Sequence, residues 1–422
     1  MKEQILNFTY AFSQCFLSAR RLEPPKSWAL AFALLRDAIL GLPKEGKKIL
    51  FFDEVPWLDS PRSGFLPALE HFWNAYVSRD PNVIVILCGS AASWMIEKVL
   101  ANRGGLHGRL TKKMRLLPFS LSEAEAFLQS REVDLPRKQL IELYMVMGGV
   151  PQYLKQVEPG LSVSQVINEQ CFSSTGYMYD EFSHLYASLF GKYRIHLELI
   201  RTLAKNKCGL SQGELLKQMK RDSSGEISHA LKELEESGFI KYSLLWGKRK
   251  SGGKYRLIDE FTYFYLKWMA DAEDIDDKSY WLKKHNTASW RSWAGYAFES
   301  ICLKHVQEIK GVLGIQAVGT SISTWHYRPK RGVEDVGAQV DLIIDRNDDC
   351  INLCELKFYS EEFTIDKDYA RKLEERKELF AKVTKTRKAL YTTLISTYGT
   401  KANNGYDRAV QSQLTIDDLF VL

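Results

Sequence analysis

Two stretches near the end of the chain, Gln339-Val-Asp-Leu-Ile-Ile-Asp345 and Ile351-Asn-Leu-Cys-Glu-Leu-Lys-Phe358, decide how we interpret its fold. Each combines an apolar run with isolated charges, which is the pattern of a largely buried β-strand. Side chains alternate along a strand, so Glu355 and Lys357 point to the same face. The spacing allows an antiparallel hairpin that would bring Asp341 close to both. We therefore predict a charged cluster at this end of a sheet.

A third acid, Glu299, lies upstream in the apolar stretch YAFESICL, which reads as a helix. The order Glu299, Asp341, Glu355-x-Lys357 resembles the PD-(D/E)xK pattern of metal-dependent nucleases. Asp341, Glu355 and the backbone carbonyl of Leu356 would bind Mg²⁺ as hard oxygen ligands. Lys357 would orient a water or stabilise the phosphate, and Glu299 would complete the metal shell or hold a bridging water.

Two interpretations without catalysis stay open for this cluster. Alternating charges on a strand often form a surface ladder, although an otherwise apolar strand requires partners for its charges. A buried salt-bridge cluster of the same residues would also produce the pattern. We interpret Asp345, Asp348 and Asp349 as turn acids and not as ligands.

The segment 191–285 has the order helix, turn, helix, hairpin. Ser211-Gln-Gly-Glu214 is a capping-box sequence that begins a short helix. Apolar residues from Ile227 to Leu234 follow at helical spacing, and a turn at Ser251-Gly-Gly253 separates two short strands. This order is typical of a winged helix-turn-helix.

The charges of this segment favour the hairpin over the helix as a contact to DNA. The second helix, Ser223–Ser237, carries four glutamates against Lys232, and phosphates would repel them. The hairpin carries cations and aromatic residues but no acid. The alternative is an interdomain or protein-binding module with a solvated hairpin. We assign DNA contact to Lys248, Arg249, Lys250 and Lys254, and the hairpin's other cations are Lys241 and Arg256.

The segment 1–129 reads as part of a nucleotide-binding α/β core. Ile49-Leu-Phe-Phe52 and Val83-Ile-Val-Ile-Leu-Cys88 are apolar runs separated by a helical stretch, as in neighbouring strands of a parallel sheet. Asp53 and Glu54 follow the first run in the form of a Walker B strand. There an Asp holds Mg²⁺ and a Glu polarises a water. A solvated strand end is the alternative.

A phosphate-binding loop to accompany the Walker B strand does not occur in the sequence. The near match Gly41–Lys48 has Lys48 where Ser or Thr should bind magnesium, and Pro43 removes a backbone donor. The match also leads into a strand, whereas a P-loop follows a strand and begins a helix. We interpret it as a solvated loop.

Several stretches resemble a family of prokaryotic AAA+/STAND-type ATPases, described as archaeal-type ATPases with a C-terminal nuclease-like domain. The resemblance implies an ATP site with Asp53 on Mg²⁺, Glu54 as catalytic base and Ser90 as a sensor of the γ-phosphate. It also implies Arg109 as an arginine finger. A strand-end turn for Ser90 and a plain surface arginine at position 109 are the alternatives. The stretches are FFDEVPWLDSPRSGFLPALEHFWN, VILCGSAASWMIEKVL, NRGGLHGRLTKKMRLLPFSLSEAEAFL, GGVPQYL, KYRLIDEFTYFYLKW and FTIDKDYARKLEERKELF.

Together these observations predict an α/β multidomain chain. Residues 1–129 would form a partial P-loop NTPase parallel sheet that lacks the Walker A loop, and the helical segment 130–190 would form its lid. Residues 191–285 would form the winged helix-turn-helix. Residues 286–422 would form the PD-(D/E)xK nuclease-like α/β domain.

Composition and charge exclude some classes of protein. No stretch approaches the roughly 20 apolar residues of a membrane span, and the first residues lack the pattern of a secretory signal. The seven cysteines are scattered without a CxxC pair, which favours reduced thiols in the cytoplasm. A net charge of +6 permits a nucleic-acid partner.

The leading functional hypothesis is an ATPase-related cytoplasmic protein whose distal domain binds or cleaves DNA with Mg²⁺. The resemblance implies ATP as a cofactor, whereas the missing P-loop, as in a truncated or start-shifted copy of the family, counts against ATP binding by this chain. A homo-oligomer stays open, because AAA+ relatives form rings or clusters. The alternative is a non-catalytic DNA- or protein-binding regulator with degenerate ATPase and nuclease domains.

Overall fold

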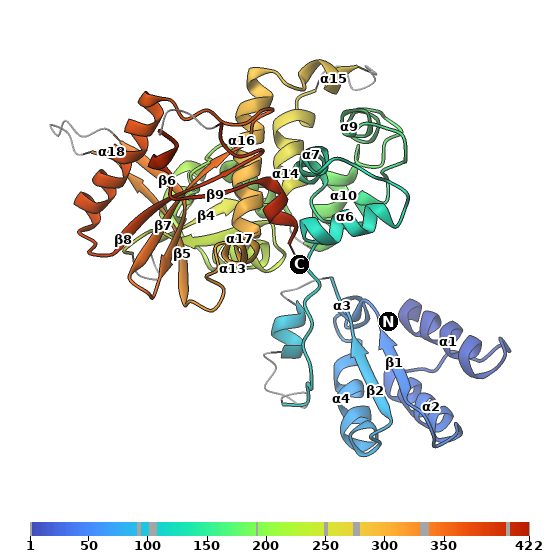
Figure 1. Cartoon of the computed structure of the whole chain (residues 1–422). Coiled ribbons are helices and arrows are strands. Elements are labelled where there is room, and N and C mark those ends of the chain that lie inside the picture. The colour runs from blue at the N-terminus through green and yellow to red at the C-terminus, as the bar shows by residue number, and fades with distance from the viewer. Residues whose placement is uncertain are drawn as a thin grey trace. The chain divides into compact units, whose positions relative to one another are not determined.

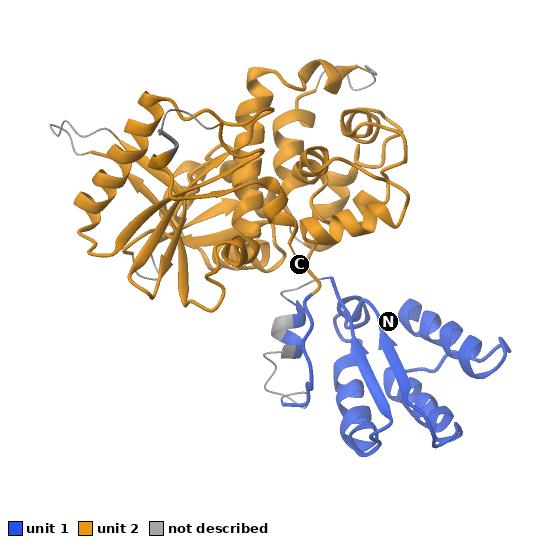
Figure 2. Ribbon diagram, viewed as in Figure 1, with its two compact units in different colours: residues 1–115 blue, residues 116–422 orange. Residues whose placement is uncertain are grey.

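The computed structural model has a mixed α/β fold and divides into two compact units, residues 1–115 and 116–422 (Figure 2). The structure describes residues 2–90, 94–100, 108–190, 193–248, 252–272, 279–329, 337–401 and 406–421.

The first unit is built on a parallel pair of strands, as the two apolar runs predict. β1 (Lys48–Phe52) pairs with β2 (Val83–Leu87), with Leu50 opposite Val85. The helical elements around the pair are α1 (Lys2–Phe16), α2 (Trp28–Leu40), α3 (Val55–Leu58), α4 (Phe65–Ala75), η1 (Val77–Arg79) and η2 (Met95–Leu100).

The core of the first unit lies on one side of this strand pair. Trp28 of α2 and Phe65 of α4 pack edge to face, with ring centroids 4.8 Å apart. On the other side, Ile49, Phe51 and Ile84 are 63%, 59% and 41% exposed. Parallel sheets in α/β folds are normally covered on both faces, so these side chains form an unburied apolar face.

The second unit contains a mixed sheet with the strand order β5-β6-β7-β8-β9 in its described part. β6 pairs antiparallel with β5 and β7, which confirms the predicted β6–β7 hairpin, and β8 pairs in parallel with β7 and β9. The strands are β5 (Thr320–Tyr327), β6 (Ala338–Arg346), β7 (Cys350–Lys357), β8 (Ala389–Ser396) and β9 (Ser412–Leu414).

Two long helices cover opposite faces of this sheet (Figure 1). The predicted apolar helix around Glu299 is α16 (Ala288–Lys304), whose buried residues share a core with Leu342 of β6. On the other face, Phe380 of α18 (Lys367–Thr384) packs against Ile343. Both faces of β6 and β7 are therefore buried, as their apolar sequences predict.

A β-bulge lies in β6 next to the predicted site. Ser323 pairs with Ile343 and Trp325 pairs with Val340, so Asp341 and Leu342 together lie opposite the single residue Thr324. Bulges bend a strand and re-aim its side chains, and they are frequent beside active sites. The position of Asp341 is therefore set by this bulge as well as by strand alternation.

The segment 191–285 has the predicted order of helices followed by a hairpin. Ser211 caps its helix by accepting from the Glu214 backbone N–H at 3.3 Å, and the Glu214 side chain completes the capping box. The elements are α11 (Tyr193–Ala204), α12 (Gln212–Met219), α13 (Gly225–Glu236), β3 (Ile240–Leu244) and β4 (Gly253–Leu257).

This hairpin docks on the five-stranded sheet. The backbone N–H of Trp246 donates to the Thr324 carbonyl at 2.9 Å, directly opposite the bulge. The Trp246 ring packs edge to face on Phe380, with centroids 5.3 Å apart. The hairpin and the segment 286–422 thus share a core.

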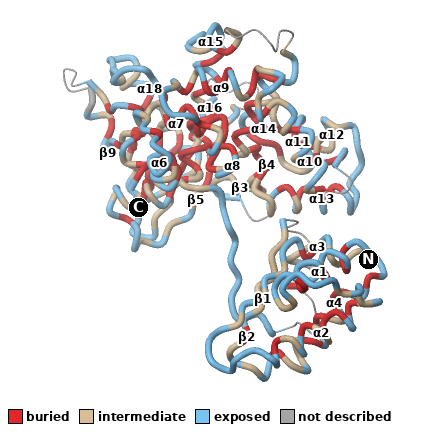
Figure 3. Tube along the Cα trace, turned by 90° about the vertical axis from the view of Figure 1, so that its right-hand side faces the viewer, coloured by how far each residue is buried: buried red, intermediate tan, exposed pale blue. Residues whose placement is uncertain are grey.

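Helices of the remaining segments complete the second unit, and Figure 3 shows buried positions along α7 and α16. Leu121 and Leu128 of α6 belong to this core, so α6 packs with the second unit although it lies within the predicted segment 1–129. No helix in the described ranges is long and apolar enough to cross a membrane. The remaining elements are α6 (Leu121–Gln129), α7 (Arg137–Met147), α8 (Pro151–Leu154), α9 (Val163–Cys171), α10 (Glu181–Leu189), α14 (Glu260–Phe264), η3 (Tyr265–Met269), α15 (Tyr280–Lys284), α17 (Val306–Val312), η4 (Tyr406–Ala409) and η5 (Ile416–Phe420).

The burial of β6 predicts the cost of removing one of its side chains. Leu342 is 0% exposed, so Leu342→Ala should lower the free energy of unfolding by about 2–5 kcal/mol through lost burial and a cavity. The control is Leu282→Ala, because Leu282 is 46% exposed and its truncation should change stability by less than about 0.5 kcal/mol. Urea unfolding followed by circular dichroism measures both, and equal effects would contradict this packing.

Candidate active site

The predicted charged cluster at the end of β7 is present, and Glu355 lies at its centre. Lys357 Nζ forms an ion pair with Glu355 Oε1 at 2.8 Å, which agrees with the shared face predicted from strand alternation. From α18, Arg376 pairs with Oε2 of the same carboxylate, and the Tyr369 hydroxyl donates to Oε1. Both oxygens of Glu355 are therefore contacted by positive or hydrogen-donating groups.

These partners keep Glu355 ionised although it is buried. Burial alone would raise the pKa of Glu355, but Arg376 and Lys357 outweigh it and lower this pKa to about 2. Burial acts to lower the pKa of Lys357, but the Glu355 carboxylate outweighs it and raises that pKa. Lys357 is therefore held as a cation in this arrangement.

Glu299 is held by an arginine from the hairpin of the preceding segment. Arg256 of β4 donates from Nη2 to Glu299 Oε2 at 2.9 Å and from Nε to Tyr296 Oη at 3.0 Å. Its guanidinium lies over the Tyr296 ring, with Cζ 4.3 Å from the centroid. Burial and the charge of Asp341 raise the pKa of Glu299 to about 7, although Arg256 acts in the opposite direction.

Asp341 connects the two groups electrostatically. The β6–β7 ladder ends at the pair Leu342–Cys354, and the next residues outward are Asp341 and Glu355. The charge of Asp341 acts with burial to raise the pKa of Glu299. Burial acts to lower the pKa of Arg376, but the charges of Glu355 and Asp341 raise it. The Asp341 carboxylate accepts a hydrogen bond from the Gln339 side chain.

The donor chemistry of this cluster suits a hard divalent cation, because carboxylate oxygens are the ligands that Mg²⁺ prefers. The carboxylates are already paired, however, with Glu299 bound to Arg256 and Glu355 bound to Arg376. Among the described residues, no group of three His, Cys, Asp or Glu side chains is placed to hold a metal ion as it stands. A cation would have to exchange with these guanidinium groups.

Two cations of the basic hairpin face the interior of the protein. Arg256 is 8% exposed, and Lys241 Nζ donates to the Leu303 carbonyl at 3.5 Å. Burial lowers the pKa of Lys241. The expectation that the cations of the hairpin suit phosphate contact is therefore wrong for Lys241 and Arg256, because both lie against α16.

The four residues assigned to DNA contact have mixed positions. Lys248 is exposed, whereas Lys254 Nζ lies 3.8 Å from Glu214 Oε2. Arg249 and Lys250 lie outside the described residues. DNA contact by these four residues stays a prediction.

At the carboxyl ends of β1 and β2, three of the residues assigned to the ATPase site lie together. Ser90 Oγ donates to Glu54 Oε2 at 3.1 Å, and Asp53 Oδ1 accepts from the Glu54 backbone N–H at 3.0 Å. Glu54 has a φ of 47°, a left-handed conformation that is uncommon for a residue with a side chain. Arg109 is exposed, and its role as an arginine finger stays a prediction.

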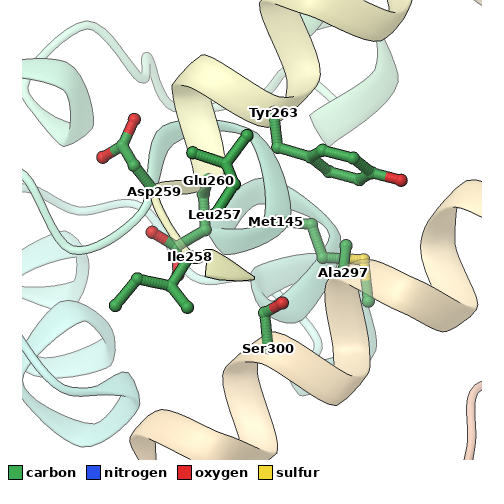
Figure 4. Close-up of a pocket in the computed structure, with 8 residues that line it drawn as sticks. All are labelled: Met145, Leu257, Ile258, Asp259, Glu260, Tyr263, Ala297 and Ser300. Atoms are coloured by element: carbon green, nitrogen blue, oxygen red, sulfur yellow. The ribbon is translucent and has the colours of Figure 1, made fainter. Parts of the chain in front are cut away.

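Two acids that line a small cavity beside α14 have structural partners (Figure 4). Asp259 caps α14 by accepting from the Thr262 backbone N–H at 2.8 Å. Glu260 is buried and pairs with Lys304 at 2.7 Å. These acids therefore stabilise the fold at this point. The lining residues are Met145, Leu257, Ile258, Asp259, Glu260, Tyr263, Ala297 and Ser300.

We did not predict from the sequence that Arg256, Tyr369 and Arg376 belong to this site. One signal was available for the last two residues. They lie two helical turns apart on the amphipathic stretch DYARKLEERKELF, so they share one face of a helix that directly follows β7. For Arg256 the sequence offered no signal, because its contact with Glu299 joins two predicted domains.

Comparison with known proteins gives distant similarities and no family. No protein-family model matches the chain. The uncharacterized protein MJECL04 of Methanocaldococcus jannaschii is 21% identical over 338 residues, which cover 78% of this chain and 71% of that protein. The solved structure of the Walker-type ATPase PABY2304 of Pyrococcus abyssi has a TM-score of 0.41 at 18% identity, over 61% of this chain and 74% of that one.

The raised pKa of Glu299 predicts a pH-dependent stability. Because this pKa rises from 4.5 to about 7 on folding, its contribution to the free energy of unfolding is fully present below pH 4.5. The contribution, on the order of 3 kcal/mol, is lost as pH rises from 4.5 through 7. Glu299→Gln should flatten this part of the profile in urea unfolding between pH 4.5 and 8. The exposed Glu378→Gln serves as the control, and a Glu299→Gln profile as steep as that of the wild type would contradict the assignment.

Proposed function

We propose that the C-terminal part of the second unit binds DNA phosphodiesters with a divalent cation and cleaves them. The observation that supports this most is that the β6–β7 ladder ends at the pair Leu342–Cys354, so that Asp341 and Glu355 are the next residues outward on the two strands. Lys357 follows on the same face and is ion-paired with Glu355. Two carboxylates and an ammonium group in this arrangement match the chemistry of metal-assisted phosphodiester hydrolysis.

Each of the four charged side chains would have its own role in cleavage. Asp341 and Glu355 would hold Mg²⁺, which supplies an acidified water and neutralises phosphate charge when bound. Lys357, kept as a cation by Glu355, would donate to the phosphate or to the attacking water. Glu299, with a pKa of about 7, is able to take up or release a proton near neutral pH.

Cation-dependent cleavage of DNA tests this proposal directly. Asp341→Asn, Glu355→Gln and Lys357→Met should each lower the rate by at least about 100-fold, because each removes a group that would act on the transition state. The measurement is the cleavage of labelled single- and double-stranded DNA with Mg²⁺ or Mn²⁺.

The matched control for these variants is Asp349→Asn. Asp349 is an acid of the β6–β7 turn with a φ of 60°, a conformation that Asn tolerates. Wild-type rates are expected for this variant. Cleavage that persists unchanged in Glu355→Gln would show that another protein or another site is responsible.

A second candidate function is non-catalytic binding of DNA or protein. The ion pairs Arg256–Glu299 and Arg376–Glu355 favour it, because a cluster of this kind also serves to join a hairpin, a helix and a sheet. In this case the wild-type protein would bind DNA without cleaving it under any cation. The same assay therefore separates the two functions.

We propose a second role, in nucleotide phosphate chemistry, for the strand ends of the first unit. It rests on the contact between Ser90 and Glu54 beside Asp53, where open α/β sheets bind ligands. The sequence Gly41–Lys48 does not match a phosphate-binding loop, so we expect this site to bind nucleotide weakly.

The weakness of the nucleotide site is measurable by thermal unfolding. Millimolar MgATP should raise the Tm by no more than about 1 °C, the shift of a ligand present near its Kd. Asp53→Asn should respond like the wild type. A shift of several degrees that Asp53→Asn abolishes would contradict this expectation and would show a working ATP site.

A further inference from the structure

Exposed tyrosines lie just beyond the carboxyl ends of β7 and β8, at the same end of the sheet as the candidate active site. The two strands run in parallel, with Lys357 opposite Ser396, so the residues that follow both strands emerge at one edge of the sheet. Tyr359 and Tyr398 are the second residues after these strands and are 47% and 43% exposed. The backbone N–H of Tyr359 donates to Thr397 Oγ1 at 2.8 Å, which joins the two segments.

A series of ring contacts connects Tyr359 with the ion pairs of the site. The Tyr359 ring packs on Phe363 with centroids 5.3 Å apart, and Phe363 packs edge to face on Tyr369 at 5.0 Å. The Tyr369 hydroxyl donates to Glu355, and Lys357 Nζ lies 5.6 Å from the centroid of the Tyr369 ring. The exposed Tyr359 ring is therefore connected to Glu355 by an unbroken series of side-chain contacts.

Hydrogen bonds fix the loop segments that carry these rings. The backbone N–H of Phe363 donates to the Gly399 carbonyl at 2.9 Å, and the Lys401 N–H donates to the Phe363 carbonyl at 3.1 Å. Ser396 Oγ accepts from the Gly399 N–H at 3.0 Å, which closes the turn around Tyr398. Tyrosine has few side-chain torsions, so a ring on a fixed backbone binds a flat partner at a low cost in conformational entropy.

Among the described residues, the charges beside these rings are of both signs. Glu361 Oε2 lies 3.9 Å from Lys401 Nζ, and Glu362 is exposed one residue further along the same loop. Binding of nucleic acid through its phosphates depends on an excess of cations. Stacking of a base on an aromatic ring does not, because every base has a π-face. The chemistry of this surface therefore favours bases over the sugar–phosphate backbone.

We propose that Tyr359 and Tyr398 form a stacking platform for unpaired bases of DNA, so that the candidate site takes single-stranded or frayed DNA. The inference rests on the proposed function, which makes DNA the ligand of this end of the sheet, and it names the form of DNA. In a closed duplex the faces of each base are covered by its neighbours, and a base must leave the stack before it contacts a protein ring.

Fluorescence anisotropy of the full chain with labelled oligonucleotides in EDTA tests the platform without a divalent cation and without cleavage. The wild type should bind a single-stranded oligonucleotide at least about fivefold more tightly than an abasic strand of the same length, because each stacked base adds affinity. Tyr359→Ala and Tyr398→Ala should each weaken binding of the single strand by at least about fivefold. Tyr359→Phe keeps a ring and should retain the wild-type affinity.

Two further measurements separate stacking from other effects of the alanine variants. Their affinity for a closed duplex should stay at the wild-type value, because its bases are not available to the rings. The affinity lost for the single strand should be the same at about 50 mM and about 200 mM salt, because it does not come from an ion pair. The control is Tyr10→Ala, since Tyr10 is 62% exposed in the first unit, and its affinity should be unchanged.

An abasic strand that binds as tightly as the normal strand, or alanine variants that bind like the wild type, would overturn the inference. The cleavage assay with Glu355→Gln would then still decide the proposed function. Base-dependent binding that Tyr359→Ala weakens, in a protein that cleaves no DNA under any cation, would support the platform and contradict cleavage. If Tyr359→Ala fails to fold, Tyr398→Ala and the abasic strand provide the test.

Discussion

The structure of the second unit depends on how it neutralises the carboxylates at the end of the β6–β7 hairpin. A buried ionised carboxylate is costly unless it is paired and hydrogen-bonded. Glu355 meets this condition through Lys357, Arg376 and Tyr369, and Glu299 meets it through Arg256. The partners come from separate segments of the chain, so the need to neutralise these acids fixes where the hairpin and α18 lie on the sheet.

The same contacts explain why the hairpin of segment 191–285 is an integral part of the second unit. Arg256 and Lys241 face α16, while Trp246 packs on Phe380 and bonds to the strand opposite the bulge. A hairpin anchored in this way cannot present all of its charge to DNA.

Much of the local structure could be predicted from the sequence, because strand alternation, capping boxes and apolar periodicity are local signals. The β6–β7 hairpin, the pairing of Glu355 with Lys357, the cap at Ser211 and the parallel β1–β2 pair follow from such signals. The bulge at Asp341 and the pair Arg256–Glu299 do not, because they depend on long-range packing. Long-range packing also decides which cations of the hairpin face the protein. The local sequence does not distinguish a cation that faces solvent from one that faces an acid, so the phosphate contact expected of Lys241 and Arg256 was wrong.

Anomalous diffraction from crystals grown with Mn²⁺ and a short DNA duplex will show whether Asp341 and Glu355 form the proposed cation site. We expect a Mn²⁺ peak about 2.0–2.3 Å from both carboxylates, with Arg376 turned away from Glu355. A DNA-bound structure that retains the Arg376–Glu355 pair and has Mn²⁺ only elsewhere would contradict it.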